Sequence, residues 1–481
     1  MAPFVSEAVQ DVPPPGSAGD RAAPSSERES EPHPHRHVVF AVVSVALLMF
    51  SQDQTAVATA LTTVSRDLQV DLAWTGWIVT IYAVGQILAL PLGGRLADAF
   101  GSRRVFLTSV GAFTVLSCLC AVAGGIGPLI ACRFLQGVAG GVMLPAANGI
   151  VAHHYGRDRD RALASFTSVF PIGAILGPLV GGLILTVWSW HAIFLVNVPL
   201  GLVVVGVAAL VVQDAPRRRP DRVDLRGITL LLLTLVSAMV AITALGTAGG
   251  AAGLPVTVAA AVVTVAGGWA FARHSRRRPD AVVPWRLVAG RGLGIMNVTN
   301  VLFGAAVIGF SALLPLYAQT RYGLAPFAAG ALLTGRAAGT IASSGVSVAL
   351  LRRTGHRPLL LGGMMIIVLG LLLSAAPATW TTPEVWLLVA ATVLGIGMGL
   401  TGPAANNAGM HLVPGDVTAV AGLRIMFRQI GGIAAVSATT AAIAASSDPG
   451  TAGAVAIVVL AGLLAAVALL AARIPNQRGR W

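Results

Sequence analysis

Residues 93–104 read GGRLADAFGSRR, and this stretch lies where one long apolar run ends and another begins. Its three arginines are Arg95, Arg103 and Arg104, its one aspartate is Asp98, and two of its three glycines, Gly94 and Gly101, are seven positions apart. Glycine permits a sharp turn and a close approach of the flanking helices, and arginines beside a membrane span stay on the cytoplasmic side. The stretch therefore predicts a cytoplasmic loop between two membrane helices. We expect Asp98 to accept hydrogen bonds from a neighbouring helix N-terminus in one conformation and to lose them in another, so that the loop acts as a conformational gate.

The composition agrees with a membrane protein. Of 481 residues, 56% are hydrophobic and 11% are charged, whereas in soluble domains about a quarter of all residues are charged. The formal net charge is +13, and no lysine occurs. A soluble protein this basic would suggest nucleic acid as a partner, but here the arginines fall in short segments between apolar runs. The positive-inside rule explains them better, and we expect no nucleic-acid binding.

A membrane helix needs about twenty apolar residues. The apolar runs predict fourteen spans, at 38–60, 74–95, 105–125, 128–151, 163–186, 193–213, 227–247, 254–272, 292–318, 326–350, 359–377, 384–409, 417–445 and 451–472. The arginines concentrate in the tails and in alternate loops, which predicts a multi-pass protein of the inner (plasma) membrane with both termini in the cytoplasm.

A second, degenerate arginine-rich loop at 351–358, LRRTGHRP, suggests two related halves. The expected organisation is a disordered cytoplasmic tail (1–37), an N-terminal six-helix bundle (38–213), a linker with two extra spans (214–291), a C-terminal six-helix bundle (292–472) and a cytoplasmic tail (473–481). The fold class is thus all-α, with a binding site expected between the two bundles near the middle of the bilayer.

Metal and disulfide chemistry are not expected. The three cysteines, Cys118, Cys120 and Cys132, lie inside apolar stretches, where small polarizable side chains pack well. The histidines of the N-terminal tail have no acidic or cysteine partners, so solvated histidines are favoured over a metal site. We expect no cofactor.

One carboxylate, Asp53, lies deep in a predicted span. A charge at that depth costs about 2.5 to 3.5 kcal/mol on insertion scales, which favours a functional role. Arg133 in the fourth span needs a polar or acidic partner, and Gln136 follows it by three residues. Burial favours the protonated form of a carboxylate and a nearby guanidinium favours the ionised form, so a pair whose separation changes can bind and release a proton. The alternative is a static ion pair that fixes helix packing.

The fifth span has glycines at every fourth position, Gly173, Gly177 and Gly181, with Pro178 and Gly182 beside them. Such a face permits backbone contact between helices, and the proline bends the helix. Weaker candidates for a cavity are Gln52, Tyr317, Arg336, Asn406 and Asn407. Each either faces the cavity or bonds to a neighbouring helix, and the arginine among them could also reach the membrane surface or bind an anionic group.

Several stretches resemble one transporter family. The pattern G-x-L-A-D-x-x-G-x-R-R is similar to the loop between helices two and three of the major facilitator superfamily. Four further stretches are similar to motifs of one branch of this superfamily, the fourteen-helix drug/proton antiporters of the EmrB/QacA-like subfamily. They are DQTAVATAL at 53–61, R-x-x-Q-G-x-x-G from Arg133, G-x-x-x-G-P-x-x-G-G from Gly173, and W-x-W-x-x-x-F-x-x-N-x-P-x-G from Trp188. The resemblance implies a major facilitator fold with two inserted helices, and the glycine motif implies export.

The resulting hypothesis is proton-coupled efflux by alternating access, with Asp53 carrying the proton. One proton per cycle disfavours export of a dication, because moving a net charge against the potential costs about 2.3 kcal/mol per 100 mV. We therefore expect a neutral or monocationic amphiphile as substrate and a monomeric protein. The alternatives are uptake of a small polar nutrient and a receptor or enzyme. No nucleophile, phosphate loop or ligand set supports an enzyme.

Overall fold

The structure, a computed structural model, describes residues 35–158, 162–163, 165–166, 169–213, 224–247, 253–278, 281, 283, 285–289, 293–412 and 417–471. Helices and short connections make up this part of the chain, and no strand occurs in it. Eleven of its helical segments are long and apolar enough to cross a membrane. The remaining three predicted spans contain the helices α8 (Val169–Val187), α16 (Pro326–Thr354) and α19 (Val417–Ala445).

The first half of the chain forms one helical bundle. Its helices are α1 (Arg36–Ala56), η2 (Val57–Ala60), α2 (Leu61–Asp67), α3 (Leu72–Thr75), α4 (Trp77–Phe100), α5 (Ser102–Ala121), α6 (Ile126–Tyr155), α8, α9 (His191–Leu195) and α10 (Asn197–Val211). Buried side chains of α1, α4, α5, α6 and α10, among them Phe50, Phe106 and Phe113, pack into one apolar core.

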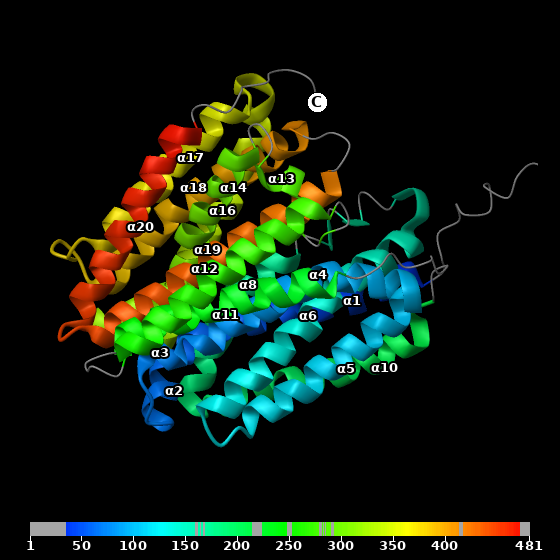
Figure 1. Cartoon of the computed structure of the whole chain (residues 1–481), viewed down its shortest axis with the longest axis horizontal. Helices are drawn as coiled ribbons and strands as arrows, with labels where there is room; N and C mark the ends of the chain where they lie inside the picture. The colour runs from blue at the N-terminus through cyan, green and yellow to red at the C-terminus, as the bar shows by residue number, and fades with distance from the viewer. Residues whose placement is uncertain are drawn as a thin grey trace, which may run out of the picture.

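The second half repeats this arrangement. Its helices are α14 (Leu293–Gly304), η4 (Ala305–Gly309), α15 (Phe310–Tyr322), α16, α17 (His356–Ala375), α18 (Pro383–Leu412), α19 and α20 (Pro449–Ala471). Its core lies mainly between α15, α16, α17, α18 and α20. Figure 1 shows α1, α5, α6 and α10 on one side of the molecule and α17, α18 and α20 on the other, with α8, α11 and α19 between them.

The two halves touch along a seam formed by α8 against α16 and by α3 and α4 against α19. A Cβ atom added at Gly182 would lie 2.8 Å from the Cα of Phe327, and one added at Gly76 would lie 2.7 Å from Oγ1 of Thr440. These residues belong to the helix ends that the arginine pattern predicts on the external side. The halves are therefore in backbone-level contact on that side.

Two further helices lie between the halves in sequence, α11 (Leu225–Thr247) and α12 (Gly253–Arg277). α11 packs against α4 and α19, and Trp77 Nε1 donates a hydrogen bond to Thr243 Oγ1 at 2.7 Å. At the start of α11, Asp224 Oδ1 accepts the Gly227 N–H at 3.0 Å and lies 2.7 Å from His274 Nε2 of α12. The helices α11 and α12 thus cover one edge of the seam. The contact between Asp224 and His274 connects their predicted cytoplasmic ends.

Some helices are longer than the apolar runs predicted. The first span, predicted to end at residue 60, continues as helix to Asp67, and the eighth, predicted to end at 272, continues to Arg277. Helices extend into the polar interface, where hydropathy no longer marks them. Two contacts agree with the predicted topology, because they join ends assigned to the cytoplasmic side. Arg36 lies 3.4 Å from Asp158, and Arg103 donates to the carbonyl oxygen of Ala209 at 2.5 Å.

The first helix of each half departs from α-helical geometry near its middle. Residues Val57–Ala60 form a 3₁₀ segment, and Ala305–Gly309 form a π-helical segment. Such segments in the middle of a long helix often mark hinges or functional sites. The first of them begins four residues after Asp53.

Candidate functional site

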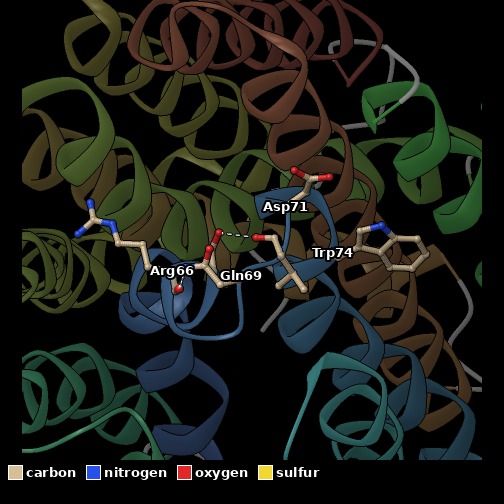
Figure 2. Close-up of a pocket in the computed structure, with 6 residues that line it drawn as sticks. Arg66, Gln69, Asp71 and Trp74 are labelled. Carbon is tan, nitrogen blue, oxygen red and sulfur yellow. Dashed lines mark hydrogen bonds between the residues drawn. The ribbon is translucent and has the colours of Figure 1, made fainter. Parts of the chain in front are cut away.

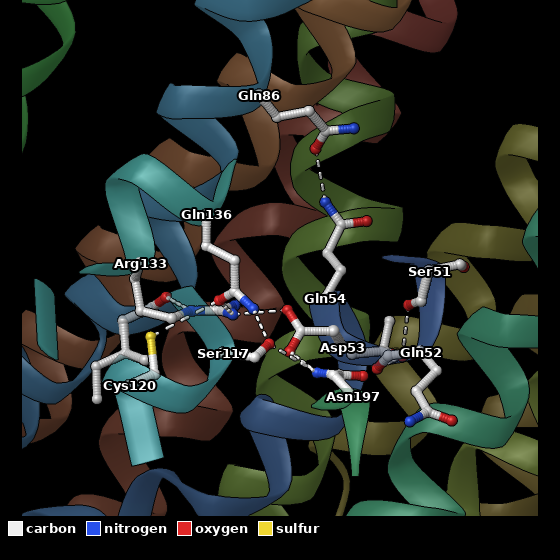
Figure 3. Close-up of polar contacts among 12 residues, drawn as sticks. Ser51, Gln52, Asp53, Gln54, Gln86, Ser117, Cys120, Arg133, Gln136 and Asn197 are labelled. Atoms are coloured by element: carbon white, nitrogen blue, oxygen red, sulfur yellow. Dashed lines mark hydrogen bonds and ion pairs between the residues drawn. The ribbon is translucent and has the colours of Figure 1, made fainter. Parts of the chain in front are cut away.

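A fully buried ion pair joins α1 and α6. Arg133 Nη1 lies 2.6 Å from Asp53 Oδ2, and both side chains have 0% of their surface exposed. Figure 3 shows the two side chains pointing toward one another from their helices. The pairing expected from the sequence is therefore present in this conformation. Neither charged group contacts solvent in this conformation.

Each charged group has further partners. Asn197 Nδ2, at the start of α10, donates to Asp53 Oδ1 at 2.8 Å. Arg133 donates through Nη1 to Gln136 Oε1 at 2.7 Å and through Nε to the carbonyl oxygen of Ile78 at 3.1 Å. Gln136 Nε2 in turn donates to Ser117 Oγ of α5 at 2.6 Å. The network thus connects α1, α4, α5, α6 and α10, and it includes the predicted Gln136.

Aromatic rings cover the guanidinium. Arg133 Cζ lies 4.2 Å from the ring centre of Tyr82 and 5.6 Å from that of Phe194, within the range of cation–π attraction. Three buried polar atoms of this cluster have no hydrogen-bond partner: Arg133 Nη2, Tyr82 Oη and Asn197 Oδ1. Buried polar groups normally find partners, so the cluster holds one spare donor at Arg133 Nη2, one spare acceptor at Asn197 Oδ1, and a Tyr82 hydroxyl that can do either.

The sequence missed Asn197 as a partner of Asp53. It lies in an otherwise apolar run, 191–211, together with Phe194. The polar residue inside that run was the signal that could have found it. Seven residues before Asn197, Trp190 Nε1 donates a hydrogen bond to Asp67 Oδ2 at 2.7 Å and so connects the start of α9 with the end of α2.

The glycine face of α8 lies directly on α1. A Cβ atom added at Gly173 would lie 2.8 Å from the carbonyl oxygen of Leu48, and one at Gly181 would lie 2.7 Å from that of Ala56. At Gly177 the added atom would overlap the Thr55 side chain. The predicted backbone contact is thus observed. The opposite face, through Pro178 and Gly182, meets α16, so α8 connects the helix of Asp53 with the C-terminal half.

Three glutamines connect the halves beside Asp53. Gln86 Oε1 of α4 accepts a hydrogen bond from Gln54 Nε2 at 2.9 Å and one from Gln429 Nε2 of α19 at 2.8 Å (Figure 3). A second polar contact across the seam joins Thr62 Oγ1 to Gln319 Oε1 at 2.6 Å. Single-sequence reasoning did not identify this cluster, because the three amides come from helices far apart in the chain.

The predicted gate loop, residues 93–104, is mostly helical, because α4 runs to Phe100 and α5 begins at Ser102, so the turn is made by Gly101 and Gly94 lies inside α4. Gly101 separates α4 from α5 with φ of 91°, a conformation that favours glycine. Asp98 lies exposed near the end of α4 and makes no hydrogen bond or ion pair with the described residues. A Cβ atom added at Gly94 would meet open space. The capping contact expected for Asp98 is therefore absent among the described residues, while Arg103 is bonded to α10 and Arg104 is exposed.

The weaker candidates have different positions. Gln52 is buried, and its side chain points away from the Asp53–Arg133 pair (Figure 3). Tyr317 lies in the core of the C-terminal half, where its hydroxyl accepts a hydrogen bond from Arg321 at 2.6 Å, and it does not face the seam. Arg336 is 9% exposed, and its Nη1 contacts Met398 Sδ at 3.8 Å. The side chains of Asn406 and Asn407 lie outside the described residues.

A pocket of about 550 Å³ opens on the predicted external side, between α2 and α3. It is lined by Ser65, Arg66, Gln69, Val70, Asp71 and Trp74 (Figure 2). This pocket is separate from the buried ion pair and belongs to the surface loop. We assign it no role in the buried site.

Proteins of related sequence include membrane transporters and resistance proteins. The chain is 30% identical over 406 residues to "Uncharacterized MFS-type transporter EfpA" of Mycobacterium tuberculosis (strain CDC 1551 / Oshkosh), with 84% of this chain and 74% of that protein covered. It is 28% identical to "Methylenomycin A resistance protein" of Streptomyces coelicolor (strain ATCC BAA-471 / A3(2) / M145), with 90% of each covered. "Multidrug resistance protein 3" of Bacillus subtilis (strain 168) is 27% identical, over 74% of this chain and 69% of that protein.

Solved structures of the same fold include a peptide transporter POT in complex with sulfate, with a TM-score of 0.66, 18% identity and coverage of 92% of this chain and 96% of that one. A mutant of the nucleoside transporter NupG superposes with a TM-score of 0.64 at 14% identity, covering 90% of this chain and 98% of that one. At these identities the likeness shows the fold alone. A family profile described as Major Facilitator Superfamily matches residues 43–436. The chain therefore belongs to the major facilitator superfamily and is a multi-pass membrane transporter.

Proposed function

We propose that the protein exports small amphiphilic molecules from the cytoplasm in exchange for protons. The observation that carries this proposal is the buried Asp53–Arg133 pair. No other carboxylate lies in the middle of a span among the described helices. A charge pair at this depth is costly to maintain, which supports a role in coupling.

The proton acts through the ion pair. When Asp53 is ionised, it holds Arg133 at 2.6 Å and so holds α1 against α6. Protonation removes the negative charge, after which the guanidinium keeps only its bonds to Gln136 and to the carbonyl oxygen of Ile78. The attraction between α1 and α6 then falls. Because a buried pair has large mutual attraction only while both groups are charged, proton binding and helix movement are coupled.

The movement of α1 reaches the seam through two routes. Gln54, next to Asp53 in the chain, bonds to Gln86 and thereby to Gln429 of the other half. Thr55 and Ala56 lie against the glycine face of α8, whose other face contacts α16. A shift of α1 on protonation therefore changes the contacts that close the predicted external side. This arrangement supports alternating access, in which the halves rock about a central site.

Export is the direction favoured by the names of relatives. The seam is closed on the predicted external side, and the glycine motif of α8 contacts both α1 and α16, as an alternating-access carrier requires. Relatives carry resistance names. We further propose that the protein acts as a monomer in the inner membrane with cytoplasmic termini, consistent with the contact between Arg36 and Asp158.

The test compares proton-driven efflux of a fluorescent amphiphile panel from cells that produce the wild type, Asp53→Asn or the control Asp71→Asn, each with and without a protonophore. Asp71 lies exposed on the predicted external surface, so its variant should behave as the wild type. We expect Asp53→Asn to abolish efflux while membrane insertion is retained. Full efflux by Asp53→Asn would show that the pair is a static packing element and would overturn the proposal.

A further inference from the structure

The spans of the C-terminal half contain arginines that form no ion pair with the residues the structure describes. Between residues 293 and 471 the sequence has three acidic residues, of which Glu384 and Asp448 lie at helix ends and Asp416 lies outside the described residues. Arg336, Arg424 and Arg428 lie well inside α16 and α19. In the described part of the chain none of the three forms a salt bridge, and the Nε atom of each is buried without a hydrogen-bond acceptor. The situation differs from that of Arg133, whose charge is neutralised by Asp53.

Arg428 is the best defined of these groups. Its Cζ atom lies 4.6 Å from the ring centre of Phe303 on α14, so the guanidinium covers that ring. The backbones of α14 and α19 are in direct contact here, because a Cβ atom added at Gly304 would overlap the carbonyl oxygen of Arg428. The side chain is thus held between two helices and is not free to reach the membrane surface.

Two more donors lie on the same faces. Arg424 precedes Arg428 by four residues, one helical turn along α19. Asn300 precedes Phe303 by three residues on α14, is 4% exposed, and its Nδ2 has no acceptor. Side chains of a helix lean toward its N-terminus, so the arginines lean toward the predicted cytoplasmic end of α19. The region therefore presents unpaired donors from two helices.

The chemistry of this cluster points to an oxyanion. All the unpaired atoms, Asn300 Nδ2, Arg424 Nε and Arg428 Nε, are hydrogen-bond donors. Guanidinium and amide donors are the groups that bind carboxylates, often through two parallel hydrogen bonds. Leaving buried donors unpaired is costly, and an incoming carboxylate would remove that cost. The π-helical segment Ala305–Gly309 follows Gly304 directly, as found at many functional sites.

We propose that Arg428, assisted by Arg424 and Asn300, binds the carboxylate of an anionic amphiphilic cargo. The proposal rests on the export function above and names the substrate class of that carrier. Arg336 is not part of this subsite, because it packs against Met398 of α18. It adds positive charge to the same half. The Asp53–Arg133 pair is on the other half, so proton and cargo would occupy separate sites.

The charge of the cargo is compatible with exchange for one proton. The sequence-based expectation was a neutral or monocationic substrate, and it disfavoured dications because their export for one proton moves charge against the membrane potential. Export of a monoanion moves negative charge out of an inside-negative cell, which the potential favours by about 2.3 kcal/mol per 100 mV for each charge. Charge balance thus permits an anion, and the unpaired donors select it.

The binding test uses one ring system with three head groups. Purified protein in phosphatidylcholine nanodiscs is titrated with 1-pyrenebutyrate, 1-pyrenebutanol and 1-pyrenebutylamine, and fluorescence anisotropy reports affinity. For the wild type we expect the carboxylate to bind at least about tenfold more tightly than the alcohol, as charge-assisted hydrogen bonds permit. Equal affinity for the three probes would overturn the proposal.

The variants separate the site from general effects. Arg428→Gln should remove the preference for the carboxylate and leave the affinity for the alcohol unchanged, which also shows that the variant is folded. Arg428→Lys should retain part of the preference. The control Arg66→Gln changes an exposed arginine of the external pocket and should have no effect. An undiminished carboxylate preference in Arg428→Gln would contradict the assignment.

Two further measurements identify what occupies the donors. If replacing phosphatidylcholine by phosphatidylglycerol abolishes carboxylate binding, the donors hold a lipid headgroup and the cargo assignment is wrong. Asp53→Asn should bind 1-pyrenebutyrate as the wild type does while its proton-driven efflux fails. A wild-type protein that prefers the carboxylate but shows no proton-driven efflux would contradict the exchange mechanism alone, and a wild-type protein that shows efflux without a carboxylate preference would contradict the subsite alone.

Discussion

Gly330 of α16 lies against the carbonyl oxygen of Pro178 in α8, at a point where a Cβ atom on the glycine would overlap that oxygen. The two residues belong to different halves of the protein, so the halves meet here with backbone against backbone. Proline in the middle of α8 leaves a carbonyl oxygen of the preceding turn without its usual donor and bends the helix. The contact is therefore sensitive to any side chain larger than hydrogen.

Gly330→Val is expected to separate the halves on the external side. A matched control is available on the same helix, because a Cβ atom at Gly345 would meet open space. Spin labels at Trp188 and Trp380, both exposed, report the distance between the external ends of the two halves in a background without native cysteines. We expect Gly330→Val to shift the distance distribution to longer values and Gly345→Val to leave it unchanged. Identical distributions for the two variants would refute the steric argument.

Arg133→Gln should destabilise the protein more than the double variant Asp53→Asn/Arg133→Gln. Removing one partner of a buried pair leaves an uncompensated charge and costs about 3 to 5 kcal/mol, whereas removing both charges costs less. Thermal unfolding of the four proteins in one detergent gives the coupling between the sites. Strictly additive losses would mean that the two side chains do not interact energetically.

Gln86→Ala should weaken the external seam and slow transport, since it leaves the amides of Gln54 and Gln429 without their acceptor. Each lost hydrogen bond is worth about 1 kcal/mol, more where a buried donor stays unpaired. Gln86→Glu retains an acceptor and is the conservative comparison. The spin-label distance described above should lengthen in Gln86→Ala. If the two substitutions had the same effect on distance and transport, the hydrogen bonds would not be the cause.

Asp98→Ala should slow turnover and leave substrate affinity unchanged. Asp98 is exposed and makes no hydrogen bond with the described residues in this conformation, so its removal does not destabilise this state. The substitution instead destabilises the proposed state in which Asp98 caps a neighbouring helix. Such a contact contributes about 1 kcal/mol, which corresponds to about a fivefold change in rate. Initial rates over a range of substrate concentrations separate the two parameters. Asp158→Ala changes another exposed aspartate on the same predicted side and serves as the control. A large loss of affinity in Asp98→Ala would contradict the gate.

The positions of the helices could be predicted from the sequence because transfer into a membrane depends on local composition. Each predicted span contains helix in the structure, and the errors are at helix ends, as at Asp67. The pairing of Asp53 with Arg133 was also predictable, since a low-dielectric interior leaves an isolated charge few alternatives. The contact of Gly173, Gly177 and Gly181 with another helix followed from their spacing, although the partner helix did not.

The tertiary structure alone decided which groups complete the site. Asn197 reaches Asp53 from 144 residues away, and Gln429 reaches Gln86 from 343 residues away. It also decided that Tyr317 packs in a core, that Asp98 is exposed, and that Arg428 Nε and Asn300 Nδ2 find no acceptor among the described residues. The physical reason is that burial of a segment in lipid is set by its own residues. The partner of a polar group, and whether it has one, is set by how distant helices pack.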